Sequence, residues 1–281
     1  MNTPDISVII PLYNKEAIIE RTVKSVLNQS FSNFELIIVN DGSTDNSFKI
    51  VKNIQDERIV IINQENGGPS KARNTGIKAA NSDWIVFLDA DDELLPEALM
   101  LFWEASAKNP TCDIFCGEVL SRKGGTIFTS VHYKEGIDKN IFKKYVLGRI
   151  NQCSGSTMYK HSLCLRCLYD EQLRRYEDLD CLFRKYHYSD VYFISSPVSC
   201  INIDYAAAST ARRSIKEDFL GHLDFSGKSF WEYMALYQFY LGEREYYPQE
   251  VKQLYPNLHK RYDLLILYKI ILLLKKLHVF A

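Results

Sequence analysis

Three carboxylates follow the end of one apolar segment. Residues 84–92 are "WIVFLDADD", which places Asp89, Asp91 and Asp92 within four positions. Carboxylates this close repel and raise one another's pKa, and folding alone gains nothing from the arrangement. A bound cation would relieve the repulsion. Because oxygen ligands suit Mg²⁺ or Mn²⁺, which commonly share their coordination shell with phosphates, the segment predicts a cation site at a strand end.

These carboxylates have two possible structural roles. If strand alternation continues through the segment, Asp89 and Asp91 point the same way. The alternative is that Asp91 and Asp92 only cap a helix that begins near Pro96, since carboxylates stabilise a helix N-terminus. One cap does not need three carboxylates, so the cation site is favoured.

Strands and helices alternate through the first hundred residues. Apolar residues recur at helical spacing between short β-branched segments, as at Ile19, Val23 and Val26. The four strands are expected at residues 6–10, 34–39, 58–62 and 84–88. This order predicts an α/β fold with a mainly parallel central sheet flanked by helices.

The polar residues of interest follow these four strands. Ligands of such sheets bind beyond the carboxyl ends of the strands, so the four loops are expected to converge on one edge. They cover residues 11–14, 40–44, 66–73 and 89–92. Taken singly, residues 40–47 could be a turn with a capped helix, and Lys71 and Arg73 could be a solvated helix face. No G-x-G-x-x-G or Walker sequence is present, which weakens dinucleotide and P-loop interpretations.

Composition excludes some classes of protein. The chain has 281 residues, 46% hydrophobic and 25% charged, which is typical of a globular protein. Its net charge of -1 and dispersed basic residues disfavour nucleic acid as a partner. The N-terminus does not resemble a signal peptide, so a cytoplasmic location is expected. Among seven cysteines, Cys164 and Cys167 form one C-x-x-C pair near His161, which is weak evidence for zinc; reduced, buried thiols are favoured.

Four motifs carry a family resemblance. "ISVIIPLYNKE", "IIVNDGSTDNS", "NGGPSKARNTGI" and "FLDADDELLP" occur in this order. In order and spacing they resemble the family 2 glycosyltransferases of the GT-A fold. The similarity is close over residues 5–100 and looser to about residue 205.

The resemblance implies a nucleoside diphosphate sugar as donor, with Mn²⁺ or Mg²⁺ as cofactor. It assigns a group of residues to the nucleotide-sugar, with Arg73 beside the nucleotide, and Asp91 also to the metal. These residues are Pro11, Tyr13, Glu16, Asp41, Arg73, Asp89 and Asp91. Their chemistry is coherent, because Tyr13 offers a stacking face, Asp41 a hydrogen-bond acceptor and Arg73 a fixed positive charge.

Transfer to a hydroxyl also needs a general base. "YEDLD" supplies Glu177, Asp178 and Asp180 at the start of a helical segment, and the resemblance implies that Asp178 is the base. The alternative is that these are acidic residues favoured in a first helical turn. Arg212 and Arg213 lie where relatives have a polar loop that closes over the donor, and they could neutralise a diphosphate.

The expected organisation is a glycosyltransferase domain at residues 1–215, divided into a nucleotide-binding half (1–100) and an acceptor half (101–215). Residues 216–281 form a helical extension. Its apolar stretch at 264–280 contains Lys269, Lys275 and Lys276 and is a poor membrane-spanning helix. An interfacial helix at the inner face of a membrane, an oligomer contact and packing against the core stay open.

The function expected is metal-dependent, inverting transfer of a sugar, from a UDP-sugar, to a glycan or lipid-linked saccharide in cell-surface polysaccharide or glycan biosynthesis. The stereochemistry comes from the resemblance. One alternative is a nucleotide-sugar-binding module without turnover, against which Asp91 and Asp178 argue. The other is a sugar nucleotidyltransferase, but no basic, glycine-rich loop follows the first strand.

Overall fold

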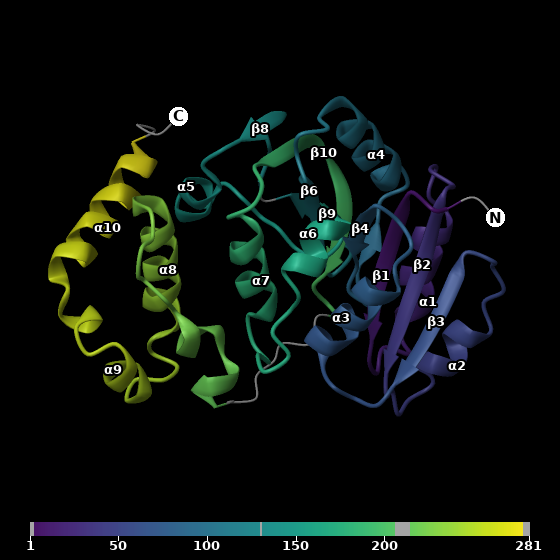
Figure 1. Ribbon diagram of the computed structural model, residues 1–281, viewed down its shortest axis with the longest axis horizontal. Coiled ribbons are helices and arrows are strands. Elements are labelled where there is room, and N and C mark those ends of the chain that lie inside the picture. Colours follow the sequence, from purple (N-terminus) through teal and green to yellow (C-terminus); the bar gives the residue numbers. More distant parts are fainter. Residues whose placement is uncertain (1–2, 130, 206–213, 278–281) are drawn as a thin grey trace.

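A single mixed sheet forms the centre of the molecule. The computed structural model describes residues 3–129, 131–205 and 214–277, and within them ten strands form the sheet (Figure 1). The strand order is β3-β2-β1-β4-β9-β6-β10-β5, with β7 beside β6 and β8 beside β10. The strands are β1 (Ile6–Leu12), β2 (Phe34–Asp41), β3 (Ile59–Gln64), β4 (Trp84–Phe87), β5 (Glu93–Leu94), β6 (Ile114–Lys123), β7 (Thr126–Thr129), β8 (Gly136–Asp138), β9 (Thr157–Lys160) and β10 (Val191–Asn202).

The four strands predicted from the first hundred residues are all present and parallel. β2 is buried along its whole length and β1 along almost all of it, as expected for strands covered on both faces. The later strands make the sheet mixed, because β9 runs antiparallel between β4 and β6 while β6 and β10 are parallel. The α/β sheet flanked by helices is therefore confirmed.

Helices cover both faces of this sheet (Figure 1). Residues of α1, α2 and α4 share one hydrophobic cluster with one face, and those of α3, α6, α7 and α8 share a second cluster with the other. The helices are α1 (Ile19–Leu27), α2 (Ser47–Lys52), α3 (Pro69–Ala79), α4 (Ala98–Lys108), α5 (Ile141–Val146), α6 (His161–Arg166), α7 (Glu177–Lys185), α8 (Phe230–Glu243), α9 (Glu250–Leu254) and α10 (Tyr262–Lys276).

The C-terminal helices share the core of the sheet. Phe219 and Phe239 lie in the same buried cluster as Phe183 of α7. Polar contacts add to this packing at the start of α7. Tyr176 has a left-handed backbone conformation there (φ 60°). Its Oη donates a hydrogen bond to Glu243 of α8 at 2.7 Å. The preceding residue, Arg175, forms ion pairs with Asp218 at 2.9 Å and with Glu243 at 2.7 Å. The first turn of α7 is therefore fixed by the C-terminal extension.

In the described part of the chain, no helix has both the length and the apolar character needed to cross a bilayer.

The α3 helix lies so close to β1 that only glycine fits at one position. A Cβ atom added to Gly76 would stand 2.4 Å from Cγ2 of Ile9, which is fully buried. Ile9 is β-branched and cannot easily rotate away. The packing of α3, which carries Arg73, thus depends on Gly76.

We expect Gly76→Ala to lower the free energy of unfolding by about 1–3 kcal/mol, because overpacking forces shifts of side chains and backbone. Urea denaturation measures this change. The matched control is Gly242→Ala in α8, where an added Cβ meets no atom within 4 Å. There alanine should raise stability by up to about 1 kcal/mol, since it is the better helix former. Equal effects at the two sites would contradict the close approach.

Candidate functional site

The loops after β1, β2, β3 and β4 meet at one edge of the sheet, as predicted. The Lys15 amide after β1 donates to Ser47 Oγ at the start of α2 at 2.7 Å. Asp41 at the end of β2 accepts from the Gly68 amide after β3 at 2.7 Å. The Lys15 ammonium also forms an ion pair with Asp91 after β4. Direct contacts therefore connect all four loops.

The acidic segment is a turn rather than an extension of the strand. β4 ends at Phe87, and the Asp92 amide donates to the Asp89 carbonyl at 3.0 Å. The prediction that Asp89 and Asp91 follow strand alternation is therefore wrong, because the backbone has already left the β conformation. Their carboxylates reach different partners on different elements.

Two cations of the chain itself balance this turn. Asp89 forms an ion pair with Arg73 of α3 at 2.9 Å, and Asp91 pairs with Lys15 of the loop after β1. The Asp89 side chain is 40% exposed and that of Asp91 only 13%. The repulsion expected from the sequence is thus relieved in part by a guanidinium and an ammonium, and Asp89 keeps an open side toward solvent.

Asp92 is the buried member of the three. Its Oδ1 accepts from the Asn202 amide at 3.0 Å, and burial, together with the nearby Asp89, raises the pKa of Asp92 to about 8. The alternative that Asp91 and Asp92 cap a helix is wrong, since α4 begins at Ala98 after Glu97 and no side chain caps it. Asp92 instead joins the acidic turn to β10.

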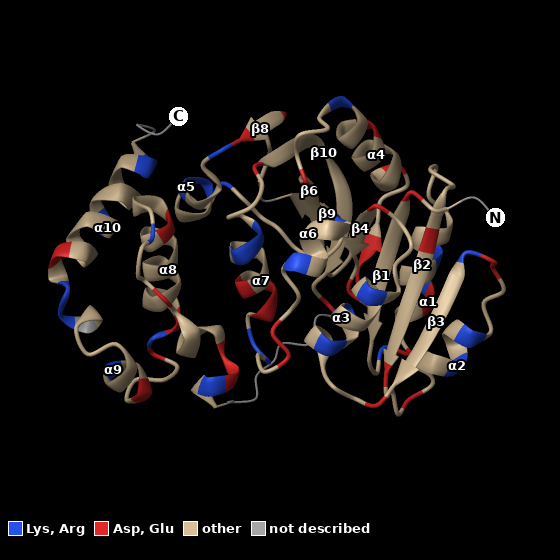
Figure 2. Ribbon diagram, in the orientation of Figure 1, with Lys and Arg blue, Asp and Glu red and all other residues tan. Residues whose placement is uncertain are grey.

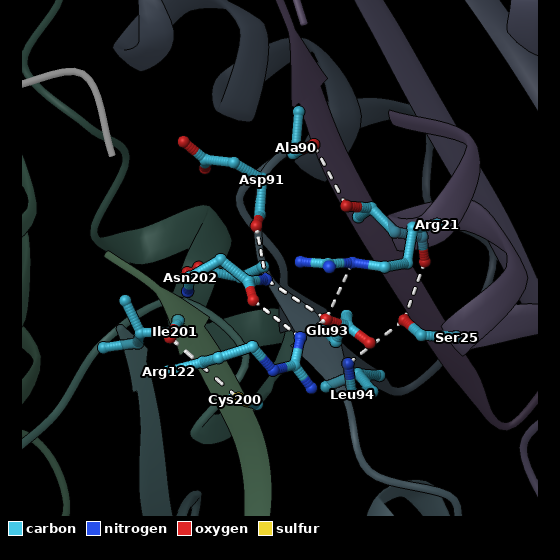
Figure 3. Close-up of polar contacts among 12 residues, drawn as sticks. Arg21, Ser25, Ala90, Asp91, Glu93, Leu94, Arg122, Cys200, Ile201 and Asn202 are labelled. Atoms are coloured by element: carbon cyan, nitrogen blue, oxygen red, sulfur yellow. Dashed lines mark hydrogen bonds and ion pairs between the residues drawn. The ribbon is translucent and has the colours of Figure 1, made fainter. Parts of the chain in front are cut away.

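Side chains of neighbouring elements contact residues 91–94 of the acidic turn and of β5, which follows it (Figure 3). The Asp91 carbonyl accepts from Asn202 Nδ2 at 2.7 Å, while the Asp91 carboxylate points away from this contact. Glu93 Oε1 contacts Arg122 and lies 2.9 Å from Arg21 Nε. The Leu94 amide donates to Ser25 Oγ at 3.1 Å. Side chains of α1, β6 and β10 therefore fix the position from which the carboxylates project.

Arg73 connects the acidic turn to α7. Its guanidinium pairs with Asp89 through Nη2 and with Glu177 through Nη1, at 2.9 and 3.0 Å, and lies 5.2 Å from the centroid of the Tyr169 ring. The side chain is only 7% exposed. Burial disfavours its charge, but the surrounding anions outweigh this and raise the pKa of Arg73. The predicted solvated-face alternative for Arg73 is therefore wrong.

Asp41 lies buried at the end of β2. Its carboxylate accepts from the amides of Gly67 and Gly68 at 2.8 and 2.7 Å and from Gln64 Nε2 at 2.7 Å. Gly68 has a φ of 87°, a conformation that favours glycine, so the paired glycines let the backbone wrap around the carboxylate. Asp41 fixes the loop after β3 beside the loop after β2.

The remaining residues predicted to bind the nucleotide lie on or after β1. Pro11 stands in the strand beside Val39 of β2. Tyr13 is 47% exposed, which leaves its ring face accessible. Glu16 Oε2 accepts from the Asn46 amide at 2.9 Å, so its carboxylate joins the first two loops.

Asp178 lines a cavity of about 80 Å³. Its neighbours Glu177 and Asp180 pair with Arg73 and Arg184, and only Asp178 of the three has no ion pair in the part of the chain that the structure describes. The side chain is reached from solvent, but the enclosing protein and then the Glu177 carboxylate raise its pKa. A carboxylate without an ion pair and with a raised pKa suits a general base.

The same cavity contains a buried lysine. Lys185, two turns after Asp178 on α7, is 1% exposed, and its Nζ lies 4.3 to 5.3 Å from the ring centroids of Phe87, Tyr159 and Tyr169. No ion pair joins it to a carboxylate among the described residues. The cavity therefore combines an aromatic floor, a carboxylate and an ammonium.

Two weaker predictions are also resolved in part. Cys164 and Cys167 are buried free thiols, as favoured. The His161 ring nitrogens lie 2.9 and 2.8 Å from the carbonyls of Ser82 and Ile77, so this side chain is occupied by backbone contacts. Arg212 and Arg213 lie outside the described residues.

Sequence reasoning missed several residues that shape this site. Lys15 lies in the first motif, just after a strand that was expected to end beside the acidic segment. A lysine at that position could have suggested the ion pair with Asp91. Glu93, Arg122 and Asn202 gave no such signal, because their contacts depend on the pairing of distant strands. Lys185 followed the "EDLD" segment at the i+7 spacing of one helix face, which was the available clue.

The sequence is similar to those of known glycosyltransferases. The glycosyl transferase family 2 model matches residues 7–167, more than half of the chain. The chain is 35% identical over 187 residues to the minor teichoic acid biosynthesis protein GgaA of Bacillus subtilis, covering 61% of this chain and 41% of that protein. It is 34% identical over 141 residues to a GalNAc(5)-diNAcBac-PP-undecaprenol beta-1,3-glucosyltransferase of Campylobacter jejuni, covering 49% and 45% of the two chains.

Among solved structures, the fold resembles S. aureus TarS 1-349 in complex with UDP-GlcNAc. The TM-score is 0.71 at 20% identity, covering 92% of this chain and 77% of the other, which supports the expected glycosyltransferase fold. The chain spans less than half the length of the curated relatives it matches. The extent of the family match, together with the four loops assembled at one sheet edge, shows that the chain belongs to glycosyl transferase family 2.

Proposed function

We propose that the chain transfers a sugar from a nucleoside diphosphate sugar, a UDP-sugar, to a hydroxyl of a glycan or lipid-linked saccharide, with inversion at the anomeric carbon. One observation carries the proposal. Arg73 bridges Asp89, on the edge where the four loops meet, to Glu177, the residue next to Asp178. A donor held at that edge would lie beside the carboxylate that can activate an acceptor.

The donor side is assigned to the residues of the first four loops. Tyr13 offers an exposed ring for the base, and Asp41 is the acceptor for a base N–H, provided that the Gly67 and Gly68 amides release one of its oxygens. Pro11 and Glu16 border the same site, and Arg73 and Asp89 stand at its inner end. UDP-GlcNAc bound to the structurally similar TarS supports a uridine nucleotide.

A divalent cation fits the acidic turn only if the bound nucleotide-sugar contributes oxygen atoms to its coordination shell. In the described part of the chain, no group of three or more His, Cys, Asp and Glu side chains is placed to hold a metal. Asp91, with the partly open Asp89, offers oxygen ligands that suit Mn²⁺ or Mg²⁺, and diphosphate oxygens would complete the set. When bound, the ion supplies positive charge that stabilises the leaving diphosphate.

The chemistry proposed for the chain's own residues is a single displacement. Asp178 takes the proton of the acceptor hydroxyl as its oxygen bonds to the anomeric carbon. The bond from that carbon to the diphosphate oxygen breaks, and UDP leaves with the electron pair.

The proposed class of acceptor is based on the names of two relatives. The Campylobacter jejuni relative is named for an undecaprenol-linked acceptor, and the Bacillus subtilis relative for teichoic acid biosynthesis. Both names support a role in assembling cell-surface polymers.

The proposal is tested first by donor binding. Thermal unfolding with a panel of UDP-sugars, UDP-GlcNAc among them, and Mn²⁺ should show a rise in Tm for the true donor, because a ligand at 100 times its Kd stabilises by about 2.7 kcal/mol. Mn²⁺-dependent release of UDP in the presence of acceptor then measures transfer. Binding without any release of UDP would point to a binding module, and the absence of all nucleotide binding would refute the proposal.

Asp178→Asn should abolish the base and leave donor binding intact. We expect transfer to fall about 10²- to 10⁴-fold, as is typical when a general base is lost. Because the pKa of Asp178 is raised, wild-type kcat/KM should fall as pH drops through a value above that of a free aspartate, and this limb should disappear in the variant.

The matched variant is Asp91→Asn, which should weaken binding of UDP with Mn²⁺ before any chemistry occurs. Titration calorimetry gives the affinity of both variants for UDP with Mn²⁺. The variants Glu177→Gln and Asp180→Asn test whether a neighbouring carboxylate can act as the base in place of Asp178. A near-normal transfer rate in Asp178→Asn, or loss of its UDP binding, would show that the base lies elsewhere.

Lys15→Met should free Asp91 for a cation. With UDP at a fixed, saturating concentration, we expect Mn²⁺ to bind about fivefold more tightly, since the ammonium that competes for the carboxylate contributes about 1 kcal/mol. Electron paramagnetic resonance of free Mn²⁺ measures this. Lys24→Met is the control, because Lys24 pairs with Glu20 on the exposed face of α1. Unchanged Mn²⁺ affinity would mean that Lys15 does not compete with the ion.

A further inference from the structure

The last helix, α10, is apolar on two opposite faces. On its inner side Ile271 is 4% exposed, and Leu264, Leu267 and Tyr268 pack against the core. On its outer side, five large apolar side chains are 46–71% exposed. These five, called the outer stripe, are Tyr262, Ile266, Ile270, Leu273 and Leu277.

The outer stripe is continuous. At about 100° per residue its members fall within an arc of about 80°, and Ile271 lies about 140° from the centre of that arc. From Tyr262 to Leu277 the stripe extends about 22 Å at 1.5 Å per residue. A helix that is apolar on every side is normally covered on every side, so this face lacks a partner in the isolated chain.

Positive charge surrounds the outer stripe. Residues 260–277 contain five basic residues and one acidic residue, in a chain whose net charge is -1. The single acid, Asp263, is paired with Arg261 at 2.7 Å. Lys269 and Lys276 are exposed and lie on the same flank of the stripe. Figure 2 shows basic residues at both ends of α10, which forms the edge of the molecule farthest from β3.

We propose that the outer stripe of α10 binds the surface of a bilayer that contains anionic lipid, with the helix lying in the plane of the interface. An apolar face bordered by lysines matches the two parts of such a surface, since acyl chains accept the apolar residues and headgroup phosphates attract the ammonium groups. A second copy of the chain is less complementary, because a two-fold contact would bring the same positive charges together.

Binding through α10 leaves the candidate site free. α8 lies between α10 and α7, the helix that carries Asp178 (Figure 1). None of the site residues takes part in this contact, and the contact does not depend on sugar transfer. It would hold the chain at the surface where lipid-linked saccharides are found.

The test is sedimentation of the full chain with vesicles of phosphatidylcholine alone or with phosphatidylglycerol. We expect binding to the anionic vesicles that exceeds binding to the neutral ones and weakens with salt. The triple variant Ile266→Ser, Ile270→Ser, Leu273→Ser should lower the apparent affinity by about tenfold or more, because each side chain loses apolar burial.

The matched control changes three side chains of similar exposure far from α10. It carries Ile127→Ser, Phe128→Ser and Leu165→Ser, and it should bind vesicles as the wild type does. Lys269→Gln with Lys276→Gln should reduce the preference for anionic vesicles, whereas Lys24→Gln with Lys108→Gln should not. Circular dichroism checks that each variant is folded.

Two results would overturn the inference. One is the absence of wild-type binding to anionic vesicles. This result would overturn the inference if the chain is a monomer, and equally if it is a dimer that the triple serine variant dissociates. The other is equal loss of vesicle binding in the triple variant and in its matched control. Light scattering after size exclusion distinguishes the monomer from the dimer.

Discussion

Charge compensation at the acidic turn is the interaction on which the candidate site depends. The fold supplies a guanidinium from α3 for Asp89 and an ammonium from the loop after β1 for Asp91, while burial raises the pKa of Asp92 to about 8. Each cation comes from a different element, so balancing the turn also fixes those elements relative to one another. Arg73 extends the arrangement to α7 through Glu177, which brings the two halves of the site together.

The two cations differ in how easily they can be replaced. Arg73 is buried, has two anionic partners and lies beside an aromatic ring, so its removal would leave charges without compensation. Lys15 is more exposed and has a flexible side chain, so under the proposed metal binding its ammonium is the one that a competing cation would displace.

The sequence predicted the parts of the structure that depend on local pattern. Alternating strands and helices gave the parallel half of the sheet, and the rule for strand ends placed four polar loops together. The direction of Asp91 was mispredicted, because periodicity does not reveal that β4 stops at Phe87. The contact of Glu93 with Arg122 and the aromatic surroundings of Lys185 join residues distant in sequence, and the strand order β4-β9-β6-β10-β5 brings them into reach.

The left-handed Tyr176 at the start of α7 has a consequence for exchanging parts between relatives. Its hydroxyl, with Arg175, holds Glu243 of α8, and Arg175 also holds Asp218. A chimaera that joined these first two hundred residues to another protein's C-terminal helices would separate both partners from the helix that carries Asp178. A recombination point that preserves the contacts of α7 therefore lies before Arg175 or after Glu243, so the C-terminal helices are exchanged together with the helix that carries Asp178.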